Sequence, residues 1–283
     1  MKKLIVNADD FGLHTQINNG IIKGYKEGFI SSASIMPGAP AWREAVDLAH
    51  ANPGLGIGIH LTLVGGIPPV LPLEKVSSLV DDNGLLFSNY GEFAKKFYFG
   101  EVLEREIEAE LRAQIERVID ADLNFTHLDS HQHIHVLPGL NRLVLKLCSE
   151  YNIKRMRIPF EGFFFTGGFQ ASVGRYIGRS GLSFCALLAA NAAKRRGIVF
   201  PDHFFGMLAG GHLNAYLVGN IIKSLPEGVS EIMTHPGIDS NNLDSIFHWH
   251  YHWQDELSAY LSKENKMLLK TEGIVLINFA MLY

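Results

Sequence analysis

Short apolar runs that lead into polar residues recur along this 283-residue chain. The first is the run at 4–6, Leu-Ile-Val, which opens into N-A-D-D-F-G at 7–12. Apolar residues then recur every three or four positions, from Ile17 to Tyr25, before Gly28. A β-branched run, a polar loop and an amphipathic stretch that ends at glycine predict a strand, a loop and a helix.

The same unit repeats further along. We expect further strands at 32–36, 55–59, 153–158, 204–207, 229–233 and 274–279, and a short buried strand around Phe125 and Leu128. Helical spacing separates most of them and is clearest over 101–119, where apolar residues line one face. Alternating strands and helices predict a parallel sheet covered by helices.

We therefore predict an α/β fold: a distorted (β/α) TIM-like barrel of seven or eight strands, formed by residues 1–283 as a single domain. Residues 65–98 are rich in Pro, Gly and turn residues, and we expect an inserted loop region over one barrel mouth. Residues 160–215 form a variable apolar and aromatic segment. A doubly wound sheet is the alternative, but no G-x-G-x-x-G follows a strand.

Charge and composition exclude several classes of function and location. A net charge of −4 and a pI near 6.3 argue against a nucleic-acid partner, which requires a basic surface. Cys148 and Cys185 form neither a C-x-x-C motif nor a disulfide framework, so a reducing cytoplasm is expected. We identify no secretory signal, because the apolar run after Lys2 and Lys3 is only three residues long. We identify no transmembrane segment, because no stretch reaches about 18 uncharged apolar residues, and the nearest, 182–193, ends at Lys194.

The most distinctive segment is T-H-L-D-S-H-Q-H-I-H at 126–135, which holds four of the thirteen histidines and an aspartate. It follows a predicted strand and precedes Pro138 and Gly139. Imidazole is the commonest metal ligand and also transfers protons near neutral pH. The segment therefore favours a metal or acid–base site over a solvated polar loop.

Other candidates also follow predicted strands, where barrels build their active sites. Asp10, His60 and His131 together offer one carboxylate and two imidazoles, a set that suits a hydrolytic metal ion and leaves positions open for water and substrate. Asp9 could then accept a proton. The alternative is that Asp9 and Asp10 only cap the next helix.

Arg157 and His235 end two later strands. Arg157 could orient Asp9 and keep it ionised, and His235 could protonate a leaving amine. The alternatives are that Arg157 forms only an ordinary surface ion pair and that His235 is only a turn residue. His248, His250 and His252 alternate with aromatic residues, which favours a solvated loop over a sugar-stacking rim.

Three motifs together, N-A-D-D-F-G at 7–12, G-I-H-L at 58–61 and the histidine segment at 126–135, resemble the YdjC-like carbohydrate deacetylases. The resemblance spans most of the chain in the right order. The stretch at 68–84 is similar to the branch associated with hopanoid lipid biosynthesis.

The resemblance implies a divalent-metal-dependent hydrolase that removes the N-acetyl group from an amino sugar, either an oligosaccharide or a glycolipid such as an N-acetylglucosaminyl hopanoid. It implies one metal ion, foremost Mg or Zn with Mn, Ni or Co as alternatives, and a possible homodimer. By the same resemblance, the metal ligands are Asp10, His60 and His131. Asp9 is the base, His235 is the acid and Arg157 is the group that orients the base. The residues that surround the ligands or contact the substrate are His127, Asp129, His133 and His135.

Three rivals stay open. A metal phosphoesterase would use similar residues but usually needs two metals and more cations than Arg157. A two-histidine, one-carboxylate iron oxygenase fits an α/β chain poorly. A non-enzymatic histidine-rich metal-binding protein would have no need of Asp9, Arg157 or His235.

Overall fold

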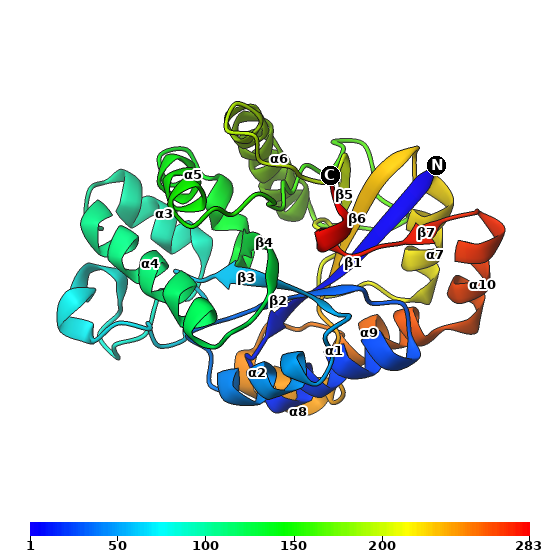
Figure 1. Ribbon diagram of the computed structural model, residues 1–283, viewed down its shortest axis with the longest axis horizontal. Helices are drawn as coiled ribbons and strands as arrows, with labels where there is room; N and C mark the ends of the chain where they lie inside the picture. Colours follow the sequence, from blue (N-terminus) through cyan, green and yellow to red (C-terminus); the bar gives the residue numbers. More distant parts are fainter.

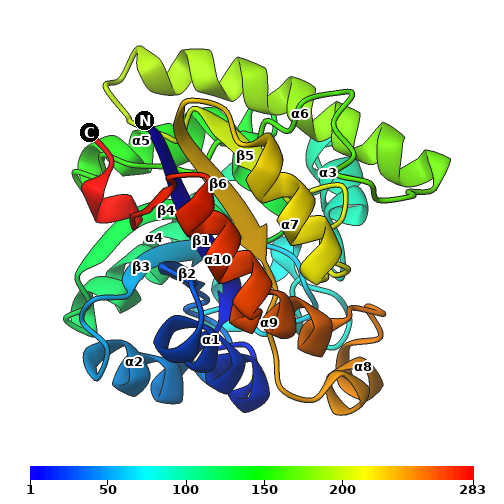
Figure 2. The same ribbon diagram turned by 90° about the vertical axis from the view of Figure 1, so that its right-hand side faces the viewer.

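The computed structural model describes residues 1–283 and contains one curled parallel sheet, a half-barrel with helices around it (Figures 1 and 2). The strand order is β4-β3-β2-β1-β6-β5, and β7 also pairs with β1. The strands are β1 (Lys2–Phe11), β2 (Ser32–Ile35), β3 (Gly56–Leu61), β4 (Phe125–Ser130), β5 (His203–Phe205), β6 (Gly228–Thr234) and β7 (Val275–Leu276). The distorted α/β barrel read from the sequence is thereby confirmed.

Ten α-helices accompany the strands. They are α1 (Thr15–Glu27), α2 (Trp42–His50), α3 (Tyr90–Tyr98), α4 (Glu104–Asp120), α5 (Leu140–Glu150), α6 (Val173–Lys194), α7 (Ala215–Ser224), α8 (Ser240–Phe247), α9 (Trp253–Leu261) and α10 (Lys263–Thr271). Short 3₁₀ turns lie at Leu73–Lys75, Ser77–Leu79, His131–Val136 and Phe279–Met281. Even the longest helix falls short of the combined length and apolarity that crossing a membrane would require.

β1 is the centre of the sheet. Its residues from Leu4 onward are buried, as expected for a strand covered on both faces. β6 pairs with one edge from Lys2 to Ala8. β7 pairs with Lys3 and Leu4, and β2 pairs further on, starting at Asn7.

The strand expected at 153–158 forms only isolated bridges. Met156 pairs with Leu128 of β4, and Arg155 pairs with Val199. Asn152, with φ of 56°, precedes this segment and Pro159 follows it, so the extended stretch is too short for a regular strand. The bridges nevertheless place Arg157 beside the end of β4, where its amide donates to the Leu128 carbonyl.

The inserted region at 65–98 contains more structure than its turn-rich sequence indicates. It includes two 3₁₀ turns and α3. Two buried glutamates of α4 hold its backbone: Glu110 accepts from the amides of Val70 and Leu71, and Glu106 accepts from Ser78. The segment at 160–215 contributes α6, which lies along the outer edge of the molecule in both views (Figures 1 and 2).

Candidate metal centre and active site

A backbone irregularity in β1 directs two neighbouring carboxylates toward one point. Asp10 has φ of 66°, and the pairing of β1 with β2 shifts register between Ala8 and Phe11. Neighbouring residues of a regular strand point to opposite faces. Here, by contrast, Asp9 Oδ2 and Asp10 Oδ1 lie 4.0 and 3.4 Å from His60 Nε2. Left-handed conformations at non-glycine residues cluster at functional sites.

Asp10, His60 and His131 converge from β1, β3 and the end of β4. All three are buried, and potential ligand atoms lie within 4.8 Å of one another. His131 Nδ1 lies 2.9 Å from Asp10 Oδ1. Asp10 Oδ2, His60 Nε2 and His131 Nε2 have no hydrogen-bond partner. Buried polar atoms are normally satisfied, so three orphaned atoms in one cluster fit a divalent cation.

Asp129 of β4 fixes the His60 ring. His60 Nδ1 donates to Asp129 Oδ1 at 2.7 Å, which directs Nε2 toward Asp10. Burial lowers the pKa of His60, but the carboxylates of Asp129, Asp10 and Asp9 outweigh burial and raise it to about 10. The cluster therefore attracts positive charge, and a carboxylate behind a histidine is the usual support of a metal ligand.

Arg157 is buried among three carboxylates. It donates to Asp9 Oδ2 through Nη1 at 2.6 Å and to Asp9 Oδ1 through Nη2 at 2.7 Å. Its Nη1 also lies 2.9 Å from Asp129, and its Nε donates to Glu231 at 2.7 Å. A second possible cluster, Asp9, His60 and Asp129, is less suited to a cation because Arg157 already pairs with both of its carboxylates.

The remaining histidines of 126–135 do not join the cluster. His127 stacks on Phe279 with ring centroids 3.6 Å apart, and burial lowers its pKa to about 3. His135 lies between the Ser130 hydroxyl and the Arg157 carbonyl. His133, with φ of 58°, packs edge-on against Phe204, and burial lowers its pKa.

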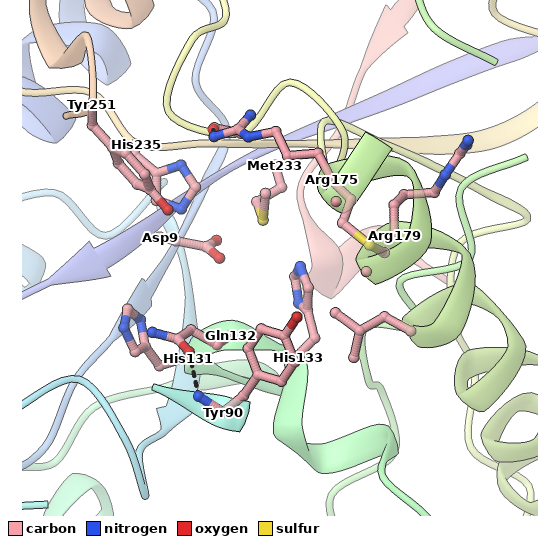
Figure 3. A pocket seen from close by; sticks show the side chains of 15 residues that line it. Asp9, Tyr90, His131, Gln132, His133, Arg175, Arg179, Met233, His235 and Tyr251 are labelled. Atoms are coloured by element: carbon pink, nitrogen blue, oxygen red, sulfur yellow. Dashed lines mark hydrogen bonds between the residues drawn. The ribbon is translucent and has the colours of Figure 1, made fainter. Parts of the chain in front are cut away.

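A cavity of about 410 Å³ opens beside the cluster (Figure 3). The Asp9 carboxylate points into it. Its walls come from distant parts of the chain: Tyr90, His131, Gln132, His133, Gly174, Arg175, Gly178, Arg179, Leu182, Met207, Gly210, Met233, His235 and Tyr251. The segment at 160–215 thus supplies one wall through α6. The guanidiniums of Arg175 and Arg179 donate to backbone carbonyls.

His235 lies at the cavity wall opposite His131 (Figure 3). Its ring packs on Tyr251 with centroids 5.0 Å apart, and its Nδ1 has no hydrogen-bond partner. Glu256 of α9 accepts from the His235 amide and from the Thr234 hydroxyl, both at 2.6 Å. The backbone of His235 is therefore fixed while its ring faces the cavity.

In the segment at 248–253 the aromatic residues, rather than the histidines, approach the site. Trp249 lies over His131 with ring centroids 5.4 Å apart, and Tyr251 lines the cavity. His248 and His250 have left-handed backbones, and the His250 side chain is exposed and faces Asp244.

Two buried carboxylates of the site were not identified from sequence. Glu231 pairs with Arg157, and Glu256 supports His235. A charged residue inside the apolar strand at 229–233 was the available signal for Glu231, because glutamate is almost never fully buried without a partner. No pattern marked Glu256 apart from other helical glutamates.

Comparison with known proteins connects this geometry to a family. A family model described as YdjC-like protein matches residues 3–271. A carbohydrate deacetylase from Brevibacillus brevis is 32% identical over 279 residues, covering 98% of both chains. One from Thermoanaerobacter pseudethanolicus is 28% identical over 282 residues, covering 100% of both. The crystal structure of a putative cellobiose-phosphate cleavage protein from Enterococcus faecalis superposes with a TM-score of 0.77 at 26% identity, over 98% of this chain and 97% of that one.

Proposed function

Since the chain belongs to the YdjC-like protein family, we propose that it is a carbohydrate deacetylase that uses a divalent metal ion to remove the N-acetyl group from an amino sugar. Membership confirms the resemblance drawn from the three sequence motifs. The hopanoid-associated branch and a homodimer remain predictions.

The observation that carries the metal-dependent mechanism is the cluster of Asp10, His60 and His131. Its three unpartnered ligand atoms fit one cation and leave the cavity side open. A divalent ion held there would polarise the acetamide carbonyl and lower the pKa of an attacking water. One carboxylate and two imidazoles suit Mg or Zn, with Mn, Ni or Co as alternatives.

Asp9 is the proposed general base. Its carboxylate points into the cavity, and Arg157 holds it with two hydrogen bonds. A carboxylate fixed at both oxygens is positioned to accept a proton from the water that attacks the carbonyl carbon. The guanidinium fork restricts the plane of the carboxylate, so Arg157 acts as a positioning residue.

His235 is the proposed general acid. Its side chain lines the cavity, from which the imidazole can give a proton to the nitrogen of the breaking C–N bond, which leaves acetate and a free amine. His235 and Asp9 both line the cavity, so base and acid can act on one substrate.

The cavity supports an N-acetylated sugar as substrate. Its volume of about 410 Å³ is typical of small-molecule sites. Tyr251 and Tyr90 are the aromatic residues in its wall, and aromatic faces pack well against sugar rings. Within this class we propose an N-acetylated oligosaccharide or a glycolipid such as an N-acetylglucosaminyl hopanoid.

Acetate release tests this function. Purified protein is stripped with a chelator, reloaded with Mg²⁺, Zn²⁺, Mn²⁺, Ni²⁺ or Co²⁺, and incubated with N-acetylglucosamine oligomers or an N-acetylglucosaminyl lipid. Acetate and a free amine should appear only in the reloaded samples. Glucosamine oligomers, which lack the acetyl group, are the matched control substrate. Equal acetate release by the stripped protein would contradict the metal-dependent mechanism.

A further inference from the structure

Apart from Arg179, helix α6 packs against the fold with small residues, and it exposes its large apolar ones. Its buried residues are Arg179, Ser183, Ala186, Ala189 and Ala193. Its exposed face carries larger side chains: Val173 (75% exposed), Ile177 (70%), Phe184 (59%), Leu187 (38%) and Leu188 (50%). A helix that covers a core normally has the reverse distribution.

These exposed residues form a continuous stripe. Val173, Ile177, Phe184 and Leu188 are spaced by four or seven residues, which 3.6 residues per turn places on one helix face. The opposite side of the helix contributes the cavity wall, including Arg175 and Arg179. In both views no other element covers the outer side of α6 (Figures 1 and 2).

Residues 162–201, which include α6, carry a net positive charge, whereas the whole chain is negative. Residues 162–201 contain five basic residues and no Asp or Glu, although the whole chain carries −4. Three of the five, Lys194, Arg195 and Arg196, are exposed where α6 ends, and none forms an ion pair. The stripe therefore ends in an unpaired cationic cluster.

A second exposed aromatic residue adjoins the helix. Phe164 is 99% exposed at the tip of the loop before α6. Arg179 holds this loop from the helix by donating to the carbonyls of Gly162 and Phe163, at 2.5 and 2.7 Å. An exposed phenylalanine on an anchored loop adds to the apolar area without requiring the loop to fold on binding.

We propose that this α6 surface, defined as Val173, Ile177, Phe184, Leu187, Leu188 and the cationic residues 194–196, docks onto an anionic lipid bilayer. Surface-lying helices bind membranes by burying an apolar face while lysines and arginines contact anionic headgroups. A symmetric second copy fits the charge less well, because residues 162–201 contain no Asp or Glu that could pair with the cationic residues of the other copy. Docking concerns binding alone and is independent of the proposed reaction.

Vesicle sedimentation tests the proposal. The whole protein is mixed with phosphatidylcholine vesicles, or with vesicles of equal phosphatidylcholine and phosphatidylglycerol, at low and high salt. We expect binding to the phosphatidylglycerol vesicles that is at least about tenfold stronger than to phosphatidylcholine alone and that weakens with salt. F184E/L188E and R195Q/R196Q should each reduce it at least about tenfold.

The matched control is Met267→Glu, which replaces an apolar residue of α10 that is also exposed. It should bind vesicles like wild type, and unfolding midpoints should show that all variants fold. Absence of vesicle binding, or equal binding by F184E/L188E and wild type, would overturn the proposal. A dimer in light scattering that F184E/L188E dissociates, without vesicle binding by wild type, would assign the surface to a second copy instead.

Discussion

Arg157 and Asp9, 148 positions apart in the chain, are joined by two hydrogen bonds of 2.6 and 2.7 Å in the buried floor of the site. The same guanidinium contacts Asp129, which in turn holds His60. The proposed base and a proposed metal ligand are thus oriented by one connected set of charged groups.

Arg157→Lys should lower kcat for acetate release by about 10²-fold. Lysine keeps the positive charge but cannot make two parallel hydrogen bonds to Asp9. Arg142→Lys is the matched control, because Arg142 is an exposed residue that donates to Glu104. If R157K retained wild-type kcat, the fork between Arg157 and Asp9 would have no part in catalysis.

His60→Ala and His131→Ala should each lose bound metal, whereas His133→Ala should retain it. All three histidines are buried and close in the fold, but only His60 and His131 join Asp10 within ligand distance. Metal content after gel filtration, measured by inductively coupled plasma mass spectrometry, separates them. If H133A lost its metal while H60A and H131A kept theirs, His133 would be the ligand and the assignment of His60 and His131 would be wrong.

Metal binding should strengthen as the pH rises. Without a cation, the carboxylates around His60 raise its pKa to about 10, so a metal must displace a proton at neutral pH. We expect the apparent association constant to rise about tenfold per pH unit between about pH 6 and 8. Calorimetry in buffers of different ionisation enthalpy should detect about one proton released per ion. An affinity independent of pH would contradict this picture.

Glu231→Gln should change how stability depends on pH. Burial raises the pKa of Glu231 from 4.5 to about 7, although Arg157 acts in the opposite direction. Because the folded-state pKa is the higher one, the stability contributed by Glu231 is present below about pH 4.5 and is lost as the pH rises through about 7. The unfolding free energy of wild type should therefore fall relative to E231Q by up to about 3 kcal/mol between about pH 5 and 8.

Glu74→Gln, which removes an exposed carboxylate, is the control for that comparison and should follow wild type. Denaturant unfolding at several pH values measures the difference. If the difference in unfolding free energy between wild type and E231Q stayed constant as the pH rises, or grew in favour of wild type, Glu231 would be ionised throughout this pH range.

Much of the site was predictable because strand ends carry the chemistry in a parallel sheet. The patterns before Asp9, His60 and His235 located those residues after apolar runs, and the structure brings them to one cavity or its edge. The register shift at Asp10 was not predictable. The motif N-A-D-D-F-G does not indicate that the carboxylates of both Asp9 and Asp10 face His60.

Other features depend on contacts between distant segments, which local patterns do not contain. The stretch at 153–158 reads as a strand, yet it pairs only through bridges at Arg155 and Met156. Helix α3 lies in a segment that reads as turns, and the apolar composition of 160–215 does not reveal that α6 forms a cavity wall. In each case tertiary packing decides what propensity leaves open.

The central claim is that neighbouring aspartates have separate roles, one binding the metal and the other moving a proton. Asp9→Asn and Asp10→Asn make the same chemical change at adjacent positions, so bound metal and acetate release measured on both provide the most direct test. D9N should keep about one metal per chain and lose at least about 10²-fold in turnover, whereas D10N should lose the metal. Metal lost from D9N, or metal and turnover retained in D10N, would contradict the account.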